Sequence, residues 1–248
     1  MKNEFTAVRM CDRPDLFDSA FKMNNSLWPD FVVNDSTSGD AQGDVGEFFP
    51  DYNLFLLDGN NVVSLISAVP LYYDGSEEDL PDEGWDWALK KSVQDHKDGI
   101  KPNTLNLLEI LINPEYQGKG VSTIATKTIF DIARNHGLSK NIVCIRPTKK
   151  ALYPLIPMKE YQDWKSDDGL PFDNWIRFHM KHGGRRIKIA QKSMCISGTV
   201  PDWEKWTGQK FPGTGDYVIK DGLVPLHIDK EKNLGTYDEP GIWFVYDL

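Results

Sequence analysis

The sequence has few cysteines and no long apolar run, and each absence excludes a class of protein. The three cysteines, Cys11, Cys144 and Cys195, form no CxxC pair, which disfavours a disulfide framework and a zinc site and is typical of a reducing compartment. No apolar run reaches the roughly 18 residues of a membrane-spanning helix. The N-terminal residues lack the apolar core of a signal peptide. We therefore expect a cytoplasmic protein without a membrane partner.

Positive charge is absent from one long stretch of the chain. Residues 23–89 contain no Lys or Arg, whereas Lys and Arg outnumber Asp and Glu in residues 119–192. The net charge of −9 argues against nucleic acid as a general partner. The segregation suits a protein whose basic half meets a polyanionic ligand and whose acidic half meets a cationic one. The alternative is that solvated faces of unlike charge separate by chance.

Hydrophobic periodicity predicts an α/β chain with a mixed α+β sheet. Strands are expected at residues 5–9, 52–57, 62–70, 105–112, 141–146, 185–197, 216–219, 224–228 and 242–246. Helices are expected at residues 13–27, 84–97, 121–136, around 175–179 and at 200–207. Residues 34–44 are polar and without period, which predicts a loop. Since there is no repeat or low-complexity linker, we expect one domain over residues 1–248, with a core of residues 1–155 and an elaborated region of residues 156–248.

Residues 105–122 carry the most informative pattern. An apolar run at residues 105–112 leads through Asn113-Pro114 into a loop with Gly118 and Gly120, and then into an amphipathic helix. A buried strand, a glycine turn and a helix N-terminus in succession make a cradle for phosphate, because the free N–H groups of the helix point at the ligand. The alternative is an ordinary strand-to-helix turn.

The loop resembles motif A of the GNAT (Gcn5-related) N-acyltransferases. That motif reads Gln/Arg-x-x-Gly-x-Gly/Ala, and the chain has Gln117-x-x-Gly120-x-Ser122, with serine in the last place. The preceding Asn113-Pro114-Glu115-Tyr116 is similar to the lead-in of the family. The resemblance implies a GNAT-like acyl-CoA N-acyltransferase fold, in which two central parallel strands splay apart and admit the pantetheine arm of coenzyme A.

The same resemblance implies which residues hold the co-substrate. Acetyl-CoA would be bound by the strand before the loop and by the loop itself, which supply Ile110, Leu111, Ile112, Gln117, Gly118, Lys119, Gly120, Val121 and Ser122. We expect no metal, because the five histidines form no HxH or HxxxH pattern.

Two residues are candidates for the acid–base chemistry of acyl transfer. Glu109 lies within the apolar run, where desolvation raises a carboxyl pKa into the range of a general base. The alternative is that Glu109 faces solvent or pairs with a cation. Ala151-Leu152-Tyr153 is similar to a helical segment of the family, without the Gly-Phe that follows it there. Tyr153 is therefore the candidate acid for the leaving thiolate, and the alternative is a tyrosine that caps a backbone group.

These observations predict an enzyme that transfers an acetyl group from acetyl-CoA to a primary amine by direct attack in a ternary complex. The acceptor would be a small-molecule or peptide amine, and a homodimer is possible. Two alternatives stay open. The aromatic C-terminal region could line a tunnel for a long acyl chain, or the chain could bind coenzyme A without turnover, as a sensor or partner module.

Overall fold

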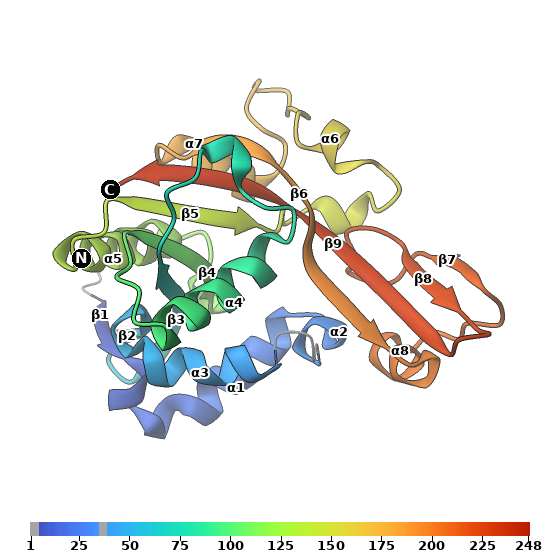
Figure 1. The fold of residues 1–248 in the computed structure, drawn as a ribbon, viewed down its shortest axis with the longest axis horizontal. Coiled ribbons are helices and arrows are strands. Elements are labelled where there is room, and N and C mark those ends of the chain that lie inside the picture. The colour runs from blue at the N-terminus through green and yellow to red at the C-terminus, as the bar shows by residue number, and fades with distance from the viewer. Residues whose placement is uncertain (1–4, 35–38) are drawn as a thin grey trace.

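The computed structural model describes residues 5–34 and 39–248, and the nine strands found there form one sheet (Figure 1). Their order is β1-β2-β3-β4-β5-β9-β8-β7, and β6 also pairs with β9. All pairs are antiparallel except β4 with β5, which is parallel. The strands are β1 (Thr6–Arg9), β2 (Asn53–Asp58), β3 (Asn61–Leu71), β4 (Thr104–Ile112), β5 (Lys140–Ile145), β6 (Arg185–Gly198), β7 (Gly215–Tyr217), β8 (Leu226–Asp229) and β9 (Leu234–Asp247).

Eight α-helices surround this sheet in the same described residues. They are α1 (Phe17–Leu27), α2 (Asp30–Val33), α3 (Gly39–Phe48), α4 (Gly84–Lys97), α5 (Val121–Asn135), α6 (Met158–Tyr161), α7 (Asn174–Lys181) and α8 (Val200–Thr207). The predicted mixed α/β fold is confirmed. None of these helices is long and apolar enough to cross a membrane.

The parallel strands β4 and β5 separate after a short paired segment. Thr104, Leu105 and Asn106 pair with residues 140–142, and the ladder stops there. The outer edges continue, since β4 pairs with β3 as far as Ile112 and β5 pairs with β9 as far as Ile145. The gap therefore opens in the middle of the sheet, between two strands that are each held firmly on their other side. This is the splayed pair that the family resemblance implies.

A β-bulge at Leu108 changes which way β4 directs its side chains. Ala68 of β3 lies opposite Leu107, and the next residue, Ser67, lies opposite Glu109, so Leu108 is the extra residue. The Trp85 indole donates a 3.1 Å hydrogen bond to the Leu108 carbonyl. Bulges of this kind redirect side chains beside functional sites. Here the bulge determines the direction of Glu109.

The helices cover both faces of the sheet. On one face, Ile129 and Ala133 of α5 pack in the same core cluster as Leu105 and Leu107 of β4. On the other face, Ala20 and Met23 of α1 pack in a separate cluster with the β2 and β3 residues Phe55 and Leu65 and with Leu111 of β4. Helix α4 contributes Ala88 to a further cluster with Ile142 and Trp243. The open part of β4 thus lies between α5 and α1.

The C-terminal region extends the sheet outward. Strands β6 and β9 run beyond the core and carry a lobe formed with β7, β8 and α8 (Figure 1). The lobe has its own apolar cluster, which includes Trp203, Leu226 and Tyr237. Phe31 of α2 joins this cluster, with ring centroids 5.8 Å from Trp203 and 5.2 Å from Tyr237. The lobe therefore holds the segment that follows α1.

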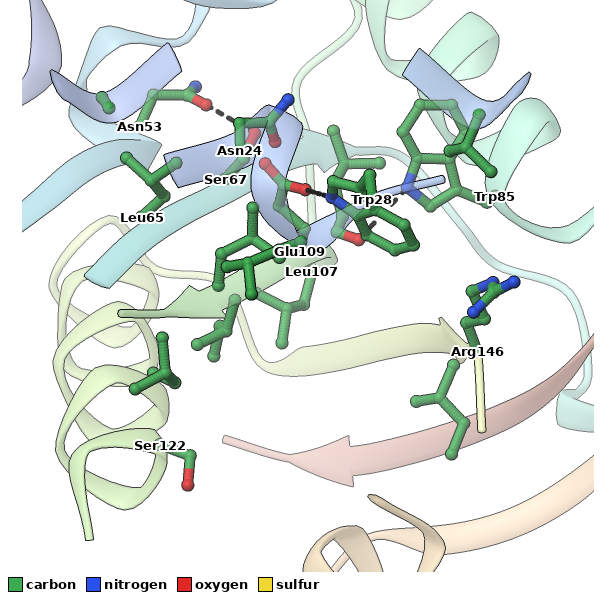
Figure 2. Close-up of a pocket in the computed structure, with 18 of the residues that line it drawn as sticks. Asn24, Trp28, Asn53, Leu65, Ser67, Trp85, Leu107, Glu109, Ser122 and Arg146 are labelled. Atoms are coloured by element: carbon green, nitrogen blue, oxygen red, sulfur yellow. Dashed lines mark hydrogen bonds between the residues drawn. The ribbon is translucent and has the colours of Figure 1, made fainter. Parts of the chain in front are cut away.

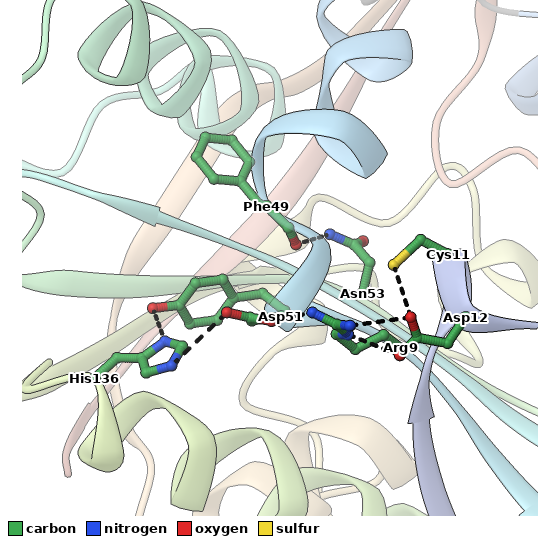
Figure 3. A network of polar contacts seen from close by, with 8 residues as sticks. Arg9, Cys11, Asp12, Phe49, Asp51, Asn53 and His136 are labelled. Carbon is green, nitrogen blue, oxygen red and sulfur yellow. Dashed lines mark hydrogen bonds and ion pairs between the residues drawn. The ribbon is translucent and has the colours of Figure 1, made fainter.

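Polar contacts tie the N-terminal strand and the end of α5 to the segment before β2 (Figure 3). The Arg9 guanidinium contacts both Asp12 and Asp51. The His136 ring nitrogen Nδ1 lies 2.7 Å from the Tyr52 hydroxyl. Burial raises the pKa of that hydroxyl to about 12, so Tyr52 stays a neutral partner. This network fixes the start of β2. Asn53, the first residue of that strand, accepts a hydrogen bond from the Ser67 hydroxyl through its side chain.

Three expectations about elements are corrected. Residues 39–48, mostly inside the predicted loop at 34–44, form α3, because Val45 is buried in the core and Phe48 packs against it; residues 35–38 lie outside the described residues. The first helix begins at Phe17, after two short 3₁₀ turns, and not at residue 13. Strand β9 begins at Leu234, well before the predicted residue 242.

Candidate active site

A cavity of about 1750 Å³ opens where β4 and β5 part. Its walls include residues of α1, β2, β3, the outer half of β4, the glycine loop and the end of β5, together with the β9 residues Glu239, Pro240 and Gly241. Ligand pockets for drug-sized molecules are usually about 300–1,000 Å³. The space therefore suits a large ligand together with a second, smaller one.

The glycine loop has the backbone that a phosphate cradle needs. Gly118 and Gly120 have φ of 72° and 78°, a region that side chains disfavour, and a Cβ on either would meet no atom within 4 Å. Gly120 is the N-cap of α5, so the N–H groups of Val121 and Ser122 belong to the first turn and have no intrahelical acceptor. Gly118, Gly120, Val121 and Ser122 all line the cavity.

The two polar side chains of the loop segment, Gln117 and Lys119, lie in different places. Gln117 lines the cavity, and its amide donates a 3.3 Å hydrogen bond to the Ile112 carbonyl, which ties the loop to the end of β4. Lys119 lies outside the cavity lining, with its Nζ 5.1 Å from the centre of the Tyr116 ring. Its role in binding the co-substrate stays a prediction.

The outer half of β4 offers open backbone to the cavity. Ile110, Leu111 and Ile112 all line it. In the described residues the β4–β5 ladder ends at Asn106, so the groups on the β5 side of these residues face the gap. A strand edge of this kind can pair with an extended ligand as it would with another strand.

Glu109 lies in the same cavity, and the Trp28 indole holds it (Figure 2). Trp28 Nε1 donates to Glu109 Oε2 at 3.0 Å. Burial raises the pKa of the Glu109 carboxyl above its ordinary value, and the Trp28 hydrogen bond opposes part of that rise. A carboxylate with a raised pKa is suited to take a proton near neutral pH.

An arginine and a second carboxylate complete the wall at the carboxyl end of β5. Arg146 Nε donates to Glu239 Oε1 at 2.7 Å, and Arg146 Nη2 donates to the Asp221 carbonyl at 2.6 Å. Tyr237 donates its hydroxyl proton to Glu239 Oε2 at 2.6 Å. Trp28, Arg146 and Glu239 were not predicted as site residues from the sequence. A polar residue directly after a buried strand was a usable signal for Arg146, whereas nothing local marked Glu239.

Tyr153 lies in an aromatic cluster. Its ring centroid is 4.9 Å from that of Trp164 and 5.8 Å from that of Phe172. Tyr153 is not among the described residues that line the cavity. The structure brings Glu109 and the glycine loop together but leaves Tyr153 apart from them, so its role as an acid stays a prediction. In the described parts of the chain, no group of three or more His, Cys, Asp or Glu residues could hold a metal ion.

Comparison with known proteins adds sequence and fold relatives. The chain is 28% identical to arginine N-acetyltransferase avaD of Aspergillus versicolor over 267 aligned positions, which cover 95% of this chain and 91% of that protein. The fold is similar to the loading GNATL domain of CurA from Lyngbya majuscula, with a TM-score of 0.65, 16% identity and coverage of 99% and 98%. It is also similar to the GphF GNAT-like decarboxylase in complex with isobutyryl-CoA, with a TM-score of 0.58, 13% identity and 98% coverage of both chains.

A family model described as "Acetyltransferase (GNAT) family" matches residues 20–155. The matched residues contain β4, the glycine loop, α5 and β5, which together form one side of the cavity. They make up more than half of the chain, and the predicted resemblance is confirmed: this protein belongs to the GNAT family of acetyltransferases.

Proposed function

We propose that this acetyltransferase moves the acetyl group of acetyl-CoA to a nitrogen of a small cationic molecule, by direct attack in a ternary complex. One observation carries the proposal. A helix N-terminus with a glycine loop and a desolvated carboxylate, Glu109, open into the same cavity at the splay of β4 and β5.

The glycine loop suits the pyrophosphate of the co-substrate. The N–H groups of Gly120, Val121 and Ser122 would meet its oxygens, and the positive end of the α5 dipole favours its charge. Ile110 to Ile112 would pair their open backbone with the amides of the pantetheine arm. Acetyl-CoA supplies an activated thioester carbonyl.

Glu109 would take the proton that the acceptor must lose. A cationic nitrogen has no lone pair for attack, so the N–H proton moves to the carboxylate as the nitrogen approaches the thioester. The new C–N bond forms, the C–S bond breaks, and the thiolate leaves as coenzyme A after it gains a proton. We keep Tyr153 as the candidate donor of that proton, to be tested by substitution.

The charges of the cavity support a cationic acceptor. Among the described lining residues, Asp18, Glu109 and Glu239 are acidic, and the one cation, Arg146, is already paired with Glu239. Because the relative avaD is an arginine N-acetyltransferase, arginine is the first acceptor to test. The three cysteines are free, which supports the cytoplasm as the proposed compartment. A homodimer stays a prediction.

Calorimetric titration with acetyl-CoA, coenzyme A and a long-chain acyl-CoA, followed by an assay of coenzyme A release with arginine and related amines, tests the proposal. We expect micromolar binding of acetyl-CoA, about −8 kcal/mol, and turnover with a cationic acceptor. Tighter binding of the long-chain compound would favour a long acyl donor. Binding without turnover across the amines would favour a non-catalytic module, and no binding would overturn the assignment.

A further inference from the structure

We propose that Trp28 is a positioning residue for Glu109, and that the C-terminal lobe holds Trp28 in place through Glu239 and Arg146. This inference rests on the proposed function, because it concerns the base of that reaction. It gives the elaborated C-terminal region a role in the catalytic step, although most of that region lies outside the cavity.

Trp28 stands at a fixed point of the backbone. It is the C-cap residue of α1, and its N–H donates a 3.1 Å hydrogen bond to the Asn24 carbonyl. Pro29, the N-cap of α2, follows it and restricts its backbone conformation further. The indole is thus presented to β4 from a rigid junction between two helices, and its single donor is used on Glu109 Oε2.

Arg146 supports the indole from its other side. Its guanidinium carbon lies 5.8 Å from the centre of the Trp28 ring, within the range of a cation–π contact. Figure 2 shows Trp28 lying between Glu109 and Arg146. Arg146 is itself fixed by Glu239 and by the Asp221 carbonyl. A chain of contacts therefore leads from β9 to the candidate base.

The lobe reaches the same segment by a second route. Phe31, three residues after Trp28, is 1% exposed and packs against both Trp203 and Tyr237. Tyr237 also donates to Glu239, so one lobe residue contacts both the α2 segment and the carboxylate that holds Arg146. Movement of Trp28 away from Glu109 would disturb both sets of contacts.

The hydrogen bond has a chemical consequence. It occupies Oε2 of Glu109 and leaves Oε1 to take the acceptor proton. A donor to a carboxylate stabilises its charged form, so Trp28 restrains the rise in pKa that burial causes. The elements around Glu109 supply few other charges: Asp18 from α1, Arg146 from the end of β5 and Glu239 from β9, with uncharged Ser67 opposite on β3.

The test compares Trp28→Phe with Trp243→Phe over a pH series of kcat/KM for the acceptor. Trp243 is the matched control, because its indole also donates a hydrogen bond, to the Pro81 carbonyl, but it is not among the described residues that line the cavity. The acidic limb of this profile is the fall in kcat/KM at low pH, where Glu109 becomes protonated. We expect Trp28→Phe to move this limb about one pH unit upward, because Glu109 loses a hydrogen-bond donor to its charged form, and we expect activity to recover at high pH. Trp243→Phe should leave this limb in place.

Two further variants complete the experiment. Arg146→Met should move the limb in the same direction by less, because the indole keeps its donor but loses its support. If Trp28→Phe does not fold, Trp28→Leu tests the same limb, and acetyl-CoA binding by calorimetry confirms that each variant is folded. The acceptor titrates identically in every assay, so a difference in the position of the acidic limb between two variants arises from the enzyme.

The outcomes separate the two claims. A wild-type protein without acetyl transfer, or a Glu109→Gln variant with full activity, would overturn the proposed function. The positioning role of Trp28 alone would be overturned if the wild-type protein is active and depends on Glu109, but the acidic limb of Trp28→Phe coincides with that of Trp243→Phe.

Discussion

Leu107 and Glu109 are two residues apart in one strand, yet they serve different parts of the molecule. Leu107 packs in the core with α5, whereas Glu109 reaches Trp28 at the end of α1. Residues i and i+2 of a regular strand share a face. The extra residue Leu108 breaks that alternation, and its carbonyl is satisfied by Trp85. Because of the bulge, the side chain of Glu109 does not share the core face of Leu107 and points into the cavity instead.

The glycine loop predicts a specific failure of co-substrate binding. Gly120→Ala places a side chain at φ 78°, beside the N–H groups proposed to hold pyrophosphate. We expect acetyl-CoA affinity to fall about tenfold or more. Gly99→Ala is the matched control, since Gly99 has a φ of 67° and is also free of close neighbours, but lies in the turn after α4. Both variants should lose about 1 kcal/mol of stability. Equal affinities in calorimetry would contradict the cradle.

The charges of the cavity predict the form of the acceptor. No described lining residue is a lysine, and Arg146 is engaged by Glu239 and the Asp221 carbonyl. A free carboxylate on the acceptor would meet Asp18, Glu109 or Glu239 without a spare cation. We therefore expect arginine amide to have a kcat/KM about tenfold above that of arginine. A clear preference for arginine over arginine amide in the coenzyme A release assay would contradict this prediction, because it would require a cation that binds the arginine carboxylate.

Substitution of Tyr153 decides between two readings of that residue. If the phenol protonates the leaving thiolate, Tyr153→Phe should lower kcat about 100-fold. If Tyr153 only packs among Trp164, Tyr161 and Phe172, kcat should change by less than about threefold, because phenylalanine keeps the ring contacts. The proposed role as acid predicts the larger loss. Steady-state kcat at saturating acetyl-CoA is the measurement, and a change of less than about threefold would remove Tyr153 from the chemistry.

The raised pKa of Glu109 predicts how stability depends on pH. Glu109 keeps its proton in the folded chain at pH values where the same carboxyl in the unfolded chain has lost it. The contribution of Glu109 to the stability of the fold is therefore fully present below the ordinary glutamate pKa and is lost as pH rises through the raised pKa of the folded chain. The glutamine of Glu109→Gln does not titrate, so the variant has no such loss. Urea unfolding should therefore show the variant gaining stability relative to wild type as pH rises above the ordinary glutamate pKa, and an unchanged difference would contradict a desolvated Glu109.

Much of the site was predictable because its pattern is local. The strand at residues 104–112, the positive-φ glycines and the helix from Val121 lie within a few dozen residues, and each has a sequence signature. Glu109 was predictable because a carboxylate stands out in an apolar run. The family resemblance added the splay, which composition and periodicity do not reveal.

The rest depends on contacts that no local pattern marks. Trp28 and Glu109 are 81 positions apart, and Arg146 and Glu239 are 93 apart. Strand β9 was predicted too short because Pro240 and Gly241 interrupt its pattern, yet Gly241 is needed there since a Cβ would meet the Cys144 sulfur. The bulge at Leu108 is likewise invisible in sequence, because it is defined by register with β3.

The rate of acetyl transfer by Glu109→Gln tests the central claim most directly. The glutamine keeps the size of the side chain and an oxygen that can accept from Trp28, but it cannot take a proton. We predict a kcat/KM at least about 100-fold below that of wild type with a cationic acceptor, together with unchanged acetyl-CoA binding in calorimetry. Transfer at the wild-type rate by a Glu109→Gln protein that binds acetyl-CoA normally would contradict the account.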